Sequence, residues 1–143
     1  MTSTLSYHYE TMGRVLAFLV ERGLSTTDLS AGNAMEIMTE RRGDEAVVLK
    51  TFADVLKWMH SEDIIRVRKL SENVGGAYTF LGVQLTAKGI ALISAPHDKE
   101  LGGSIERKVT EAEGKKLDSS IYAKIGEIAG GFAGGFTKSI SSG

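Results

Sequence analysis

The sequence predicts a mainly α-helical domain that carries one small antiparallel β-hairpin and is followed by a further C-terminal helix. Three observations support this fold class. Apolar residues recur with helical period between residues 7 and 61. The pattern then changes to two-residue alternation over 64–70, followed by a β-branched and aromatic run over 78–85. Near the C-terminus, glycines lie inside an otherwise helical apolar pattern.

The composition is that of an ordinary globular domain. The 143 residues are 42% hydrophobic and 24% charged, and 17 Lys and Arg against 18 Asp and Glu give a net charge of −1. Overall charge therefore does not indicate a nucleic-acid binder. The absence of cysteine excludes disulfides, thiolate metal sites and thiol nucleophiles. Residues 1–6 lack a signal-peptide pattern, and no apolar run approaches the length of a membrane span. We therefore expect a cytoplasmic protein.

Three helices are expected first. The first covers 7–22 and ends at Gly23, a residue that readily takes the left-handed conformation after a helix. A shorter second helix is expected over roughly 30–41, after a segment rich in N-cap residues. The third covers 45–61, with Asp44 as its N-cap and one apolar stripe made of Val48, Phe52, Val55, Leu56 and Met59.

The hairpin and a closing helix follow. Two strands, over 64–70 and 78–85, are joined by a short loop that contains glycine, which predicts a β-hairpin. Thr86 is then expected to cap a helix over 87–95, which Pro96 stops.

Beyond Pro96 the pattern weakens. Residues 97–120 are predicted to be a polar linker, in which a short helix over 104–113 has weak support. Residues 121–143 are predicted to form the glycine-patterned amphipathic C-terminal helix.

This order of elements resembles the winged helix-turn-helix superfamily. Residues 55–65 (VLKWMHSEDII) look like the end of that family's third helix running into its first wing strand. Residues 85–93 (LTAKGIALI) look like its second wing strand turning into a closing helix. The resemblance covers about residues 8–95 and implies a winged-helix domain over 1–96. It further implies that the third helix enters the DNA major groove and that the wing contacts the backbone.

The local charge supplies candidate DNA contacts. Residues 41–69 hold seven basic and five acidic residues, a net of +2. If the domain is a winged helix, the candidate DNA-contacting residues lie before the third helix, on its exposed side, and on the wing. They are Arg41, Arg42, Lys50, Thr51, Lys57, Arg66, Arg68, Lys69 and Asn73. The alternative interpretations are a solvated helix face and an edge strand whose charges oppose aggregation.

The C-terminal segment is unusual because five glycines interrupt an apolar helical pattern. Each glycine costs a helix about 1 kcal/mol relative to alanine, so close approach to another helix is the expected offset. We expect a homodimer contact made by Ile121, Ile125, Gly126, Ile128, Gly130, Phe132, Gly134 and Phe136. Docking onto the same chain, and a flexible or membrane-surface tail, are the alternatives.

The resulting hypothesis is a small DNA-binding transcriptional regulator that acts as a homodimer. The alternative is a winged-helix module that binds another protein and no DNA. The net charge of −1 and the apolar start of the third helix support this alternative. A third hypothesis is that residues 121–140 bind a membrane surface. We expect no enzymatic activity, no cofactor and no metal, since His8, His60 and His97 have no ligand-like spacing.

Overall fold

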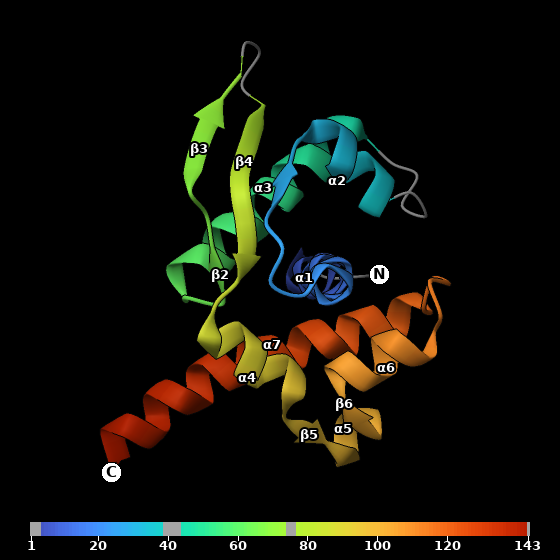
Figure 1. Cartoon of the computed structure of the whole chain (residues 1–143), viewed down its shortest axis with the longest axis vertical. Helices are drawn as coiled ribbons and strands as arrows, with labels where there is room; N and C mark the ends of the chain where they lie inside the picture. Colours follow the sequence, from blue (N-terminus) through green and yellow to red (C-terminus); the bar gives the residue numbers. More distant parts are fainter. Residues whose placement is uncertain (1–3, 39–43, 74–76, 143) are drawn as a thin grey trace.

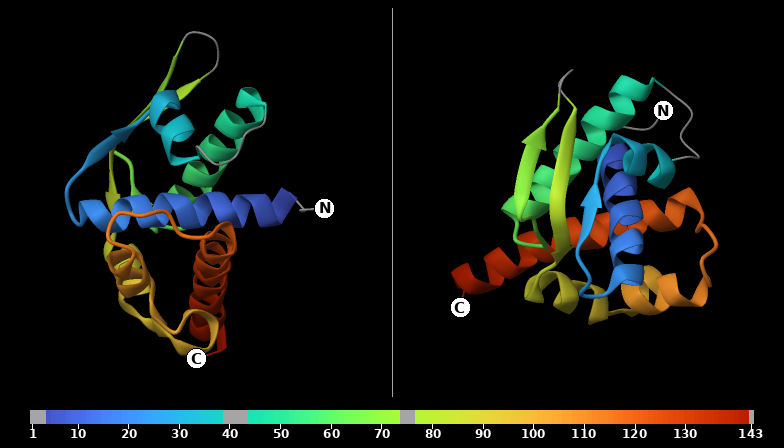
Figure 2. Two further views of the ribbon diagram at one scale, coloured as in Figure 1. Left: turned by 90° about the vertical axis from the view of Figure 1, so that its right-hand side faces the viewer. Right: turned by 45° about the horizontal axis from the view of Figure 1, so that its top comes forward.

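The computed structural model describes residues 4–38, 44–73 and 77–142, with side chains through Phe132. It confirms a mainly α-helical fold with a small antiparallel sheet (Figure 1). Helix α1 lies between two groups of elements (Figure 2). The hairpin, α2 and α3 lie on one side of α1, and α4 to α7 lie on the other.

The first three helices lie close to their predicted positions. Helix α1 spans Thr4–Arg22, α2 spans Ala31–Ile37 and α3 spans Glu45–Ser61. Helix α2 is shorter than predicted, and residues 39–41 of the predicted helix lie outside the described residues. The Asp44 side chain accepts a hydrogen bond from the Ala46 N–H at 2.9 Å, so the predicted cap of α3 is confirmed.

The sheet contains one strand that was not predicted. Its central strand β4 (Tyr78–Leu85) pairs antiparallel with β1 (Thr27–Leu29) on one side and with β2 (Ile65–Arg66) and β3 (Lys69–Glu72) on the other. The segment that forms β1 was interpreted as the approach to a helix, because Thr and Asp also favour N-caps. A strand of three residues is too short to show a clear alternation of apolar and polar residues, so it could not be predicted without its partner strand.

A bulge in β4 joins β1 to the hairpin. Thr27 pairs with Val83 but Leu29 pairs with Phe80, so β4 contains one extra residue there. Gly82 takes a φ of +65°, and its N–H donates to the Asp28 carboxylate at 2.9 Å. This backbone conformation is the reason that glycine stands inside an otherwise bulky strand.

The chain leaves the sheet through a capped turn. Helix α4 (Ala87–Ser94) begins after Thr86, whose hydroxyl accepts from the Gly89 N–H at 3.0 Å, as predicted. The same hydroxyl donates to the Ile64 carbonyl at 3.0 Å. A Cβ at Gly89 would lie 2.2 Å from that carbonyl oxygen, so the absence of a side chain permits this close packing.

The predicted polar linker over 97–120 is folded onto the core, and the short helix that had weak support over 104–113 is present. This segment holds α5 (Asp98–Leu101) and α6 (Ile105–Glu111), and a pair of two-residue strands lies around α5. Leu101, Ile105 and Val109 are buried in the same core as α1 and α3. Their spacing of four residues carried the helical signal, but the polar residues between them obscured it.

The C-terminal helix α7 (Ser119–Ser142) packs across α1. In Figure 1 α7 runs across the view while α1 is seen end-on. A Cβ at Gly126 would lie 1.9 Å from the Tyr9 carbonyl oxygen, and a Cβ at Gly13 would lie 1.9 Å from the Tyr122 carbonyl oxygen. We call these four residues the glycine crossing. Each glycine lies against the backbone of the tyrosine on the other helix.

A buried ion pair accompanies the glycine crossing. The Arg14 Nε and the Glu10 carboxylate lie 3.2 Å apart, and their side chains are only 2% and 5% exposed. The Arg14 guanidinium lies 4.5 Å from the centre of the Tyr122 ring. A buried charge is tolerated only when it is paired, so these partners hold the polar part of α1 against α7.

The first prediction concerns the glycine crossing. Gly126→Ala should lower the free energy of unfolding by about 1–3 kcal/mol, because the new methyl group overlaps the α1 backbone. Gly131→Ala on the same helix is the matched control, because no atom lies within 4 Å of its Cβ position. It should raise helix stability by about 1 kcal/mol. Urea denaturation followed by circular dichroism measures both, and equal effects of the two variants would contradict the crossing.

The second prediction concerns the start of α7. The Asp118 carboxylate accepts from the hydroxyl and the N–H of Ser120, and these hydrogen bonds lower the pKa of Asp118 below its ordinary value of 3.8. The contribution to stability is therefore complete above the unfolded-state pKa and is lost as the pH falls through the lowered pKa. Asp118→Asn should lose stability at neutral pH relative to the unmodified chain, and the difference should shrink in acid. Thermal unfolding as a function of pH measures this difference, and a gap that widens in acid would refute the prediction.

Candidate functional site

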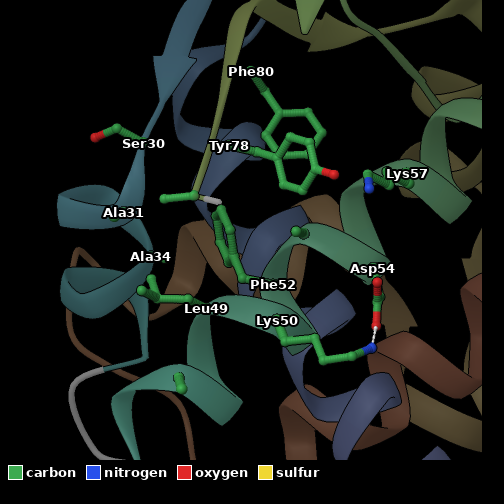
Figure 3. A pocket seen from close by; sticks show the side chains of 13 residues that line it. Ser30, Ala31, Ala34, Leu49, Lys50, Phe52, Asp54, Lys57, Tyr78 and Phe80 are labelled. Carbon is green, nitrogen blue, oxygen red and sulfur yellow. Dashed lines mark hydrogen bonds and ion pairs between the residues drawn. The ribbon is translucent and has the colours of Figure 1, made fainter. Parts of the chain in front are cut away.

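A groove of about 410 Å³ lies between α2, α3 and β4 (Figure 3). Figure 3 shows Ala31 and Ala34 of α2 on one side, with Lys50, Asp54 and Lys57 of α3 on the other. The lining between them is largely apolar and includes Leu49, Phe52, Ala53, Tyr78 and Phe80. The groove can therefore take apolar groups and offers few polar partners to orient them.

The start of α2 is fixed locally at the edge of the groove. The Asn33 side-chain oxygen accepts from the Ser30 N–H and from the Ser30 hydroxyl, each at 3.0 Å. This arrangement places the first turn of α2, including Ala31 and Ala34, along the groove.

An aromatic pair forms the β4 wall of the groove. The ring centres of Tyr78 and Phe80 are 6.4 Å apart and tilted by 48°. The Lys57 amino group lies 3.9 Å from the centre of the Tyr78 ring, which is a cation–π contact. Lys57 is thereby held against the hairpin.

The other lysine of the groove is paired with a carboxylate. The Lys50 amino group lies 2.7 Å from the Asp54 carboxylate, one helical turn along α3. The two side chains are 78% and 43% exposed, so this pair contributes little to stability. It does, however, neutralise one of the two cations of the groove.

The predicted DNA contacts on α3 are only partly where the sequence analysis expected them. Lys50 and Lys57 border the groove, but the prediction that Thr51 lies on the exposed side is wrong. Thr51 is 7% exposed, because the buried stripe of α3 is wider than the apolar residues alone indicated. It lies three residues after Val48 and four before Val55, on the inner face of the helix.

The predicted wing cations lie on the opposite face of the sheet from the groove. Lys69 pairs with Leu81, and its neighbour Leu70 pairs with Phe80, which lines the groove. Because neighbouring strand residues point to opposite faces, Lys69 points away from α3. Arg66 follows the same rule, because it is exposed while its neighbour Ile65 is buried. The structure therefore does not bring Arg66 and Lys69 together with Lys50 and Lys57.

The remaining candidates have other surroundings. Arg68 is exposed, and its side chain packs beside Gly82 at the bulge of β4. The Asn73 side chain is exposed and donates to the Thr79 hydroxyl at 2.9 Å, which closes the end of the hairpin. Arg41 and Arg42 lie outside the described residues.

The aromatic wall of the groove was not among the predicted site residues. Tyr78 and Phe80 were recognised only as strand formers, since nothing local shows which face of a strand turns toward a helix. Their two-residue spacing was the available signal, because it places both rings on one face. Leu49 was missed for a related reason, since it lies beside the main apolar stripe of α3.

The predicted dimer contacts of α7 are largely used within the chain. Ile125 is fully buried and Gly126 lies against Tyr9, so their assignment to a second copy is wrong and the intramolecular alternative applies. A Cβ at Gly130 would also approach the Tyr9 ring, at 3.1 Å. Three further candidates are half-buried: Ile121, Ile128 and Phe132. Gly134 and Phe136 lie beyond Phe132, the last residue whose surroundings are described.

The described residues contain no cluster of three or more His, Asp and Glu side chains arranged to hold a metal ion. Among the helices that the structure describes, none is long and apolar enough to cross a membrane. Comparison with known proteins gave no matching protein family, no matching curated protein and no matching solved structure.

Proposed function

We propose that this chain is a protein-recognition module whose groove between α2, α3 and β4 takes an apolar segment of a partner protein. The observation that carries the proposal is the lining of the groove. Apolar side chains dominate it, and the aromatic pair Tyr78 and Phe80 forms one wall. Buried aromatic groups surrounded by a partly polar rim are typical of the residues that dominate binding energy between proteins.

The charges around the groove favour this proposal over DNA binding. Lys50 is neutralised by Asp54, and Lys57 lies against Tyr78. Phosphate contacts depend on several cations that share one surface, and here the exposed Arg66 and Lys69 point away from α3. The groove therefore keeps only the charge of Lys57, which lies at the Tyr78 ring, and an apolar protein segment can fill the rest of the lining without a counter-charge.

Exposed apolar side chains beside the groove extend the same surface. Leu70 is 43% exposed and shares its sheet face with Phe80. Val47, near the start of α3, is 51% exposed. Apolar side chains in such a position are typical of an interaction surface.

The third prediction tests the groove with a peptide library. Peptides selected from a random displayed library on the full chain should carry aromatic or aliphatic anchors. Leu49→Glu should weaken their binding about tenfold or more, because it places a charge in the apolar lining. Leu24→Glu is the control, because Leu24 is 70% exposed and does not line the groove. Equal weakening by the two variants, or selected peptides without apolar anchors, would overturn the proposal.

DNA binding is the second candidate, and the exposed Arg66 on the outer face of the hairpin is the observation that favours it. In that proposal the chain is a DNA-binding regulator that acts as a homodimer. The fourth prediction is that the full chain shows no salt-dependent shift of mixed-sequence duplexes in an electrophoretic assay. A shift that weakens with salt, and that the double variant Arg66→Ala with Lys69→Ala removes, would instead favour the DNA-binding proposal.

A further inference from the structure

A second cavity, of about 440 Å³, lies where α1, α3 and α7 meet. Its wall on α1 is the stripe Leu5, His8, Tyr9 and Met12, whose spacing of three, four and seven residues places them on one face. Helix α3 supplies Asp54, Val55 and Trp58, and α7 supplies Gly130. A volume of this size falls within the range of small-molecule sites in proteins.

The lining of this cavity combines aromatic rings with one carboxylate. His8, Tyr9 and Trp58 are half-buried, so their rings remain partly open to solvent at the cavity. The faces of aromatic rings attract cations. A carboxylate beside the rings adds a direct attraction between opposite charges. Asp54 is the one carboxylate among the described lining residues, and no Lys or Arg belongs to that lining.

Gly130 keeps the α7 side of the cavity open. A Cβ at this position would lie 3.1 Å from Cε1 of the Tyr9 ring, closer than ordinary side-chain packing. The glycine therefore lets the ring of Tyr9 lie beside α7 and line the cavity. A helix interior disfavours glycine, so its presence here is explained by the space that it leaves.

We propose that this cavity binds a small organic cation that carries an aromatic ring, with Asp54 as its counter-ion. The present partner of Asp54 is Lys50, whose side chain is 78% exposed. An exposed ion pair of this kind is weakly held, so a bound cation can replace Lys50 at the carboxylate. The proposal does not rest on the protein-recognition function, because its cavity lies apart from the aromatic wall of the groove and shares only Asp54 with it.

The fifth prediction uses the fluorescence of Trp58, the single tryptophan of the chain. Benzylamine, which is a cation at neutral pH, should change this fluorescence in a saturable way. Benzyl alcohol, a neutral molecule of nearly the same shape, should bind at least about tenfold more weakly, because it lacks the charge that Asp54 neutralises. Asp54→Asn should weaken benzylamine binding by a similar factor, whereas Glu36→Gln, an exposed carboxylate outside the cavity, should not.

A second variant separates binding from damage to the fold. Lys50→Gln removes the competing cation and should therefore tighten benzylamine binding about twofold to threefold. A merely destabilised cavity would not bind more tightly. The proposal is overturned if neither probe changes the fluorescence, if benzyl alcohol binds as well as benzylamine, or if Lys50→Gln weakens binding.

Discussion

The contact between α1 and α7 is the interaction on which the rest of the structure depends. Gly13 and Gly126 let each helix lie against the backbone of the other, next to Tyr122 and Tyr9. Helix α1 is then enclosed, with the sheet, α2 and α3 on its other side (Figure 2). One continuous core results, which includes Leu16 of α1 as well as residues from α3 to α7. Helix α7 therefore supports α1 from the side opposite α3, and α1 is one of the helices against which α3 packs.

The features that could be predicted from the sequence are those that local chemistry decides. Asp44 and Thr86 cap their helices because a short polar side chain satisfies free N–H groups a few residues away. Contacts between residues that are far apart in the chain could not be predicted from local chemistry. Strand β1 exists only because β4 lies beside it, and Gly13 looks like any helical glycine until Tyr122 lies across it. The role of the C-terminal glycines was predicted as close helix approach, and only the identity of the partner helix was wrong.

The charged surface around the candidate site could not be predicted from the sequence for the same reason. Arg66 and Lys50 are close enough in sequence to be counted in one basic segment, but the sheet separates them onto different faces. A count of charges along the chain cannot contain this information, because strand alternation and register decide which face a side chain takes. The same geometry places Tyr78 against Lys57, and an apolar groove results where a basic surface was expected.

The glycine crossing also sets the order of events during synthesis. Tyr9 and Gly126 meet in space although more than a hundred residues separate them in the chain. At ordinary translation rates, α1 waits roughly 5–20 s after its own synthesis for α7 to follow it. During that interval the face of α1 that carries Tyr9 and Gly13 has no partner helix. The packing of α1 can therefore become complete only after α7 has emerged from the ribosome.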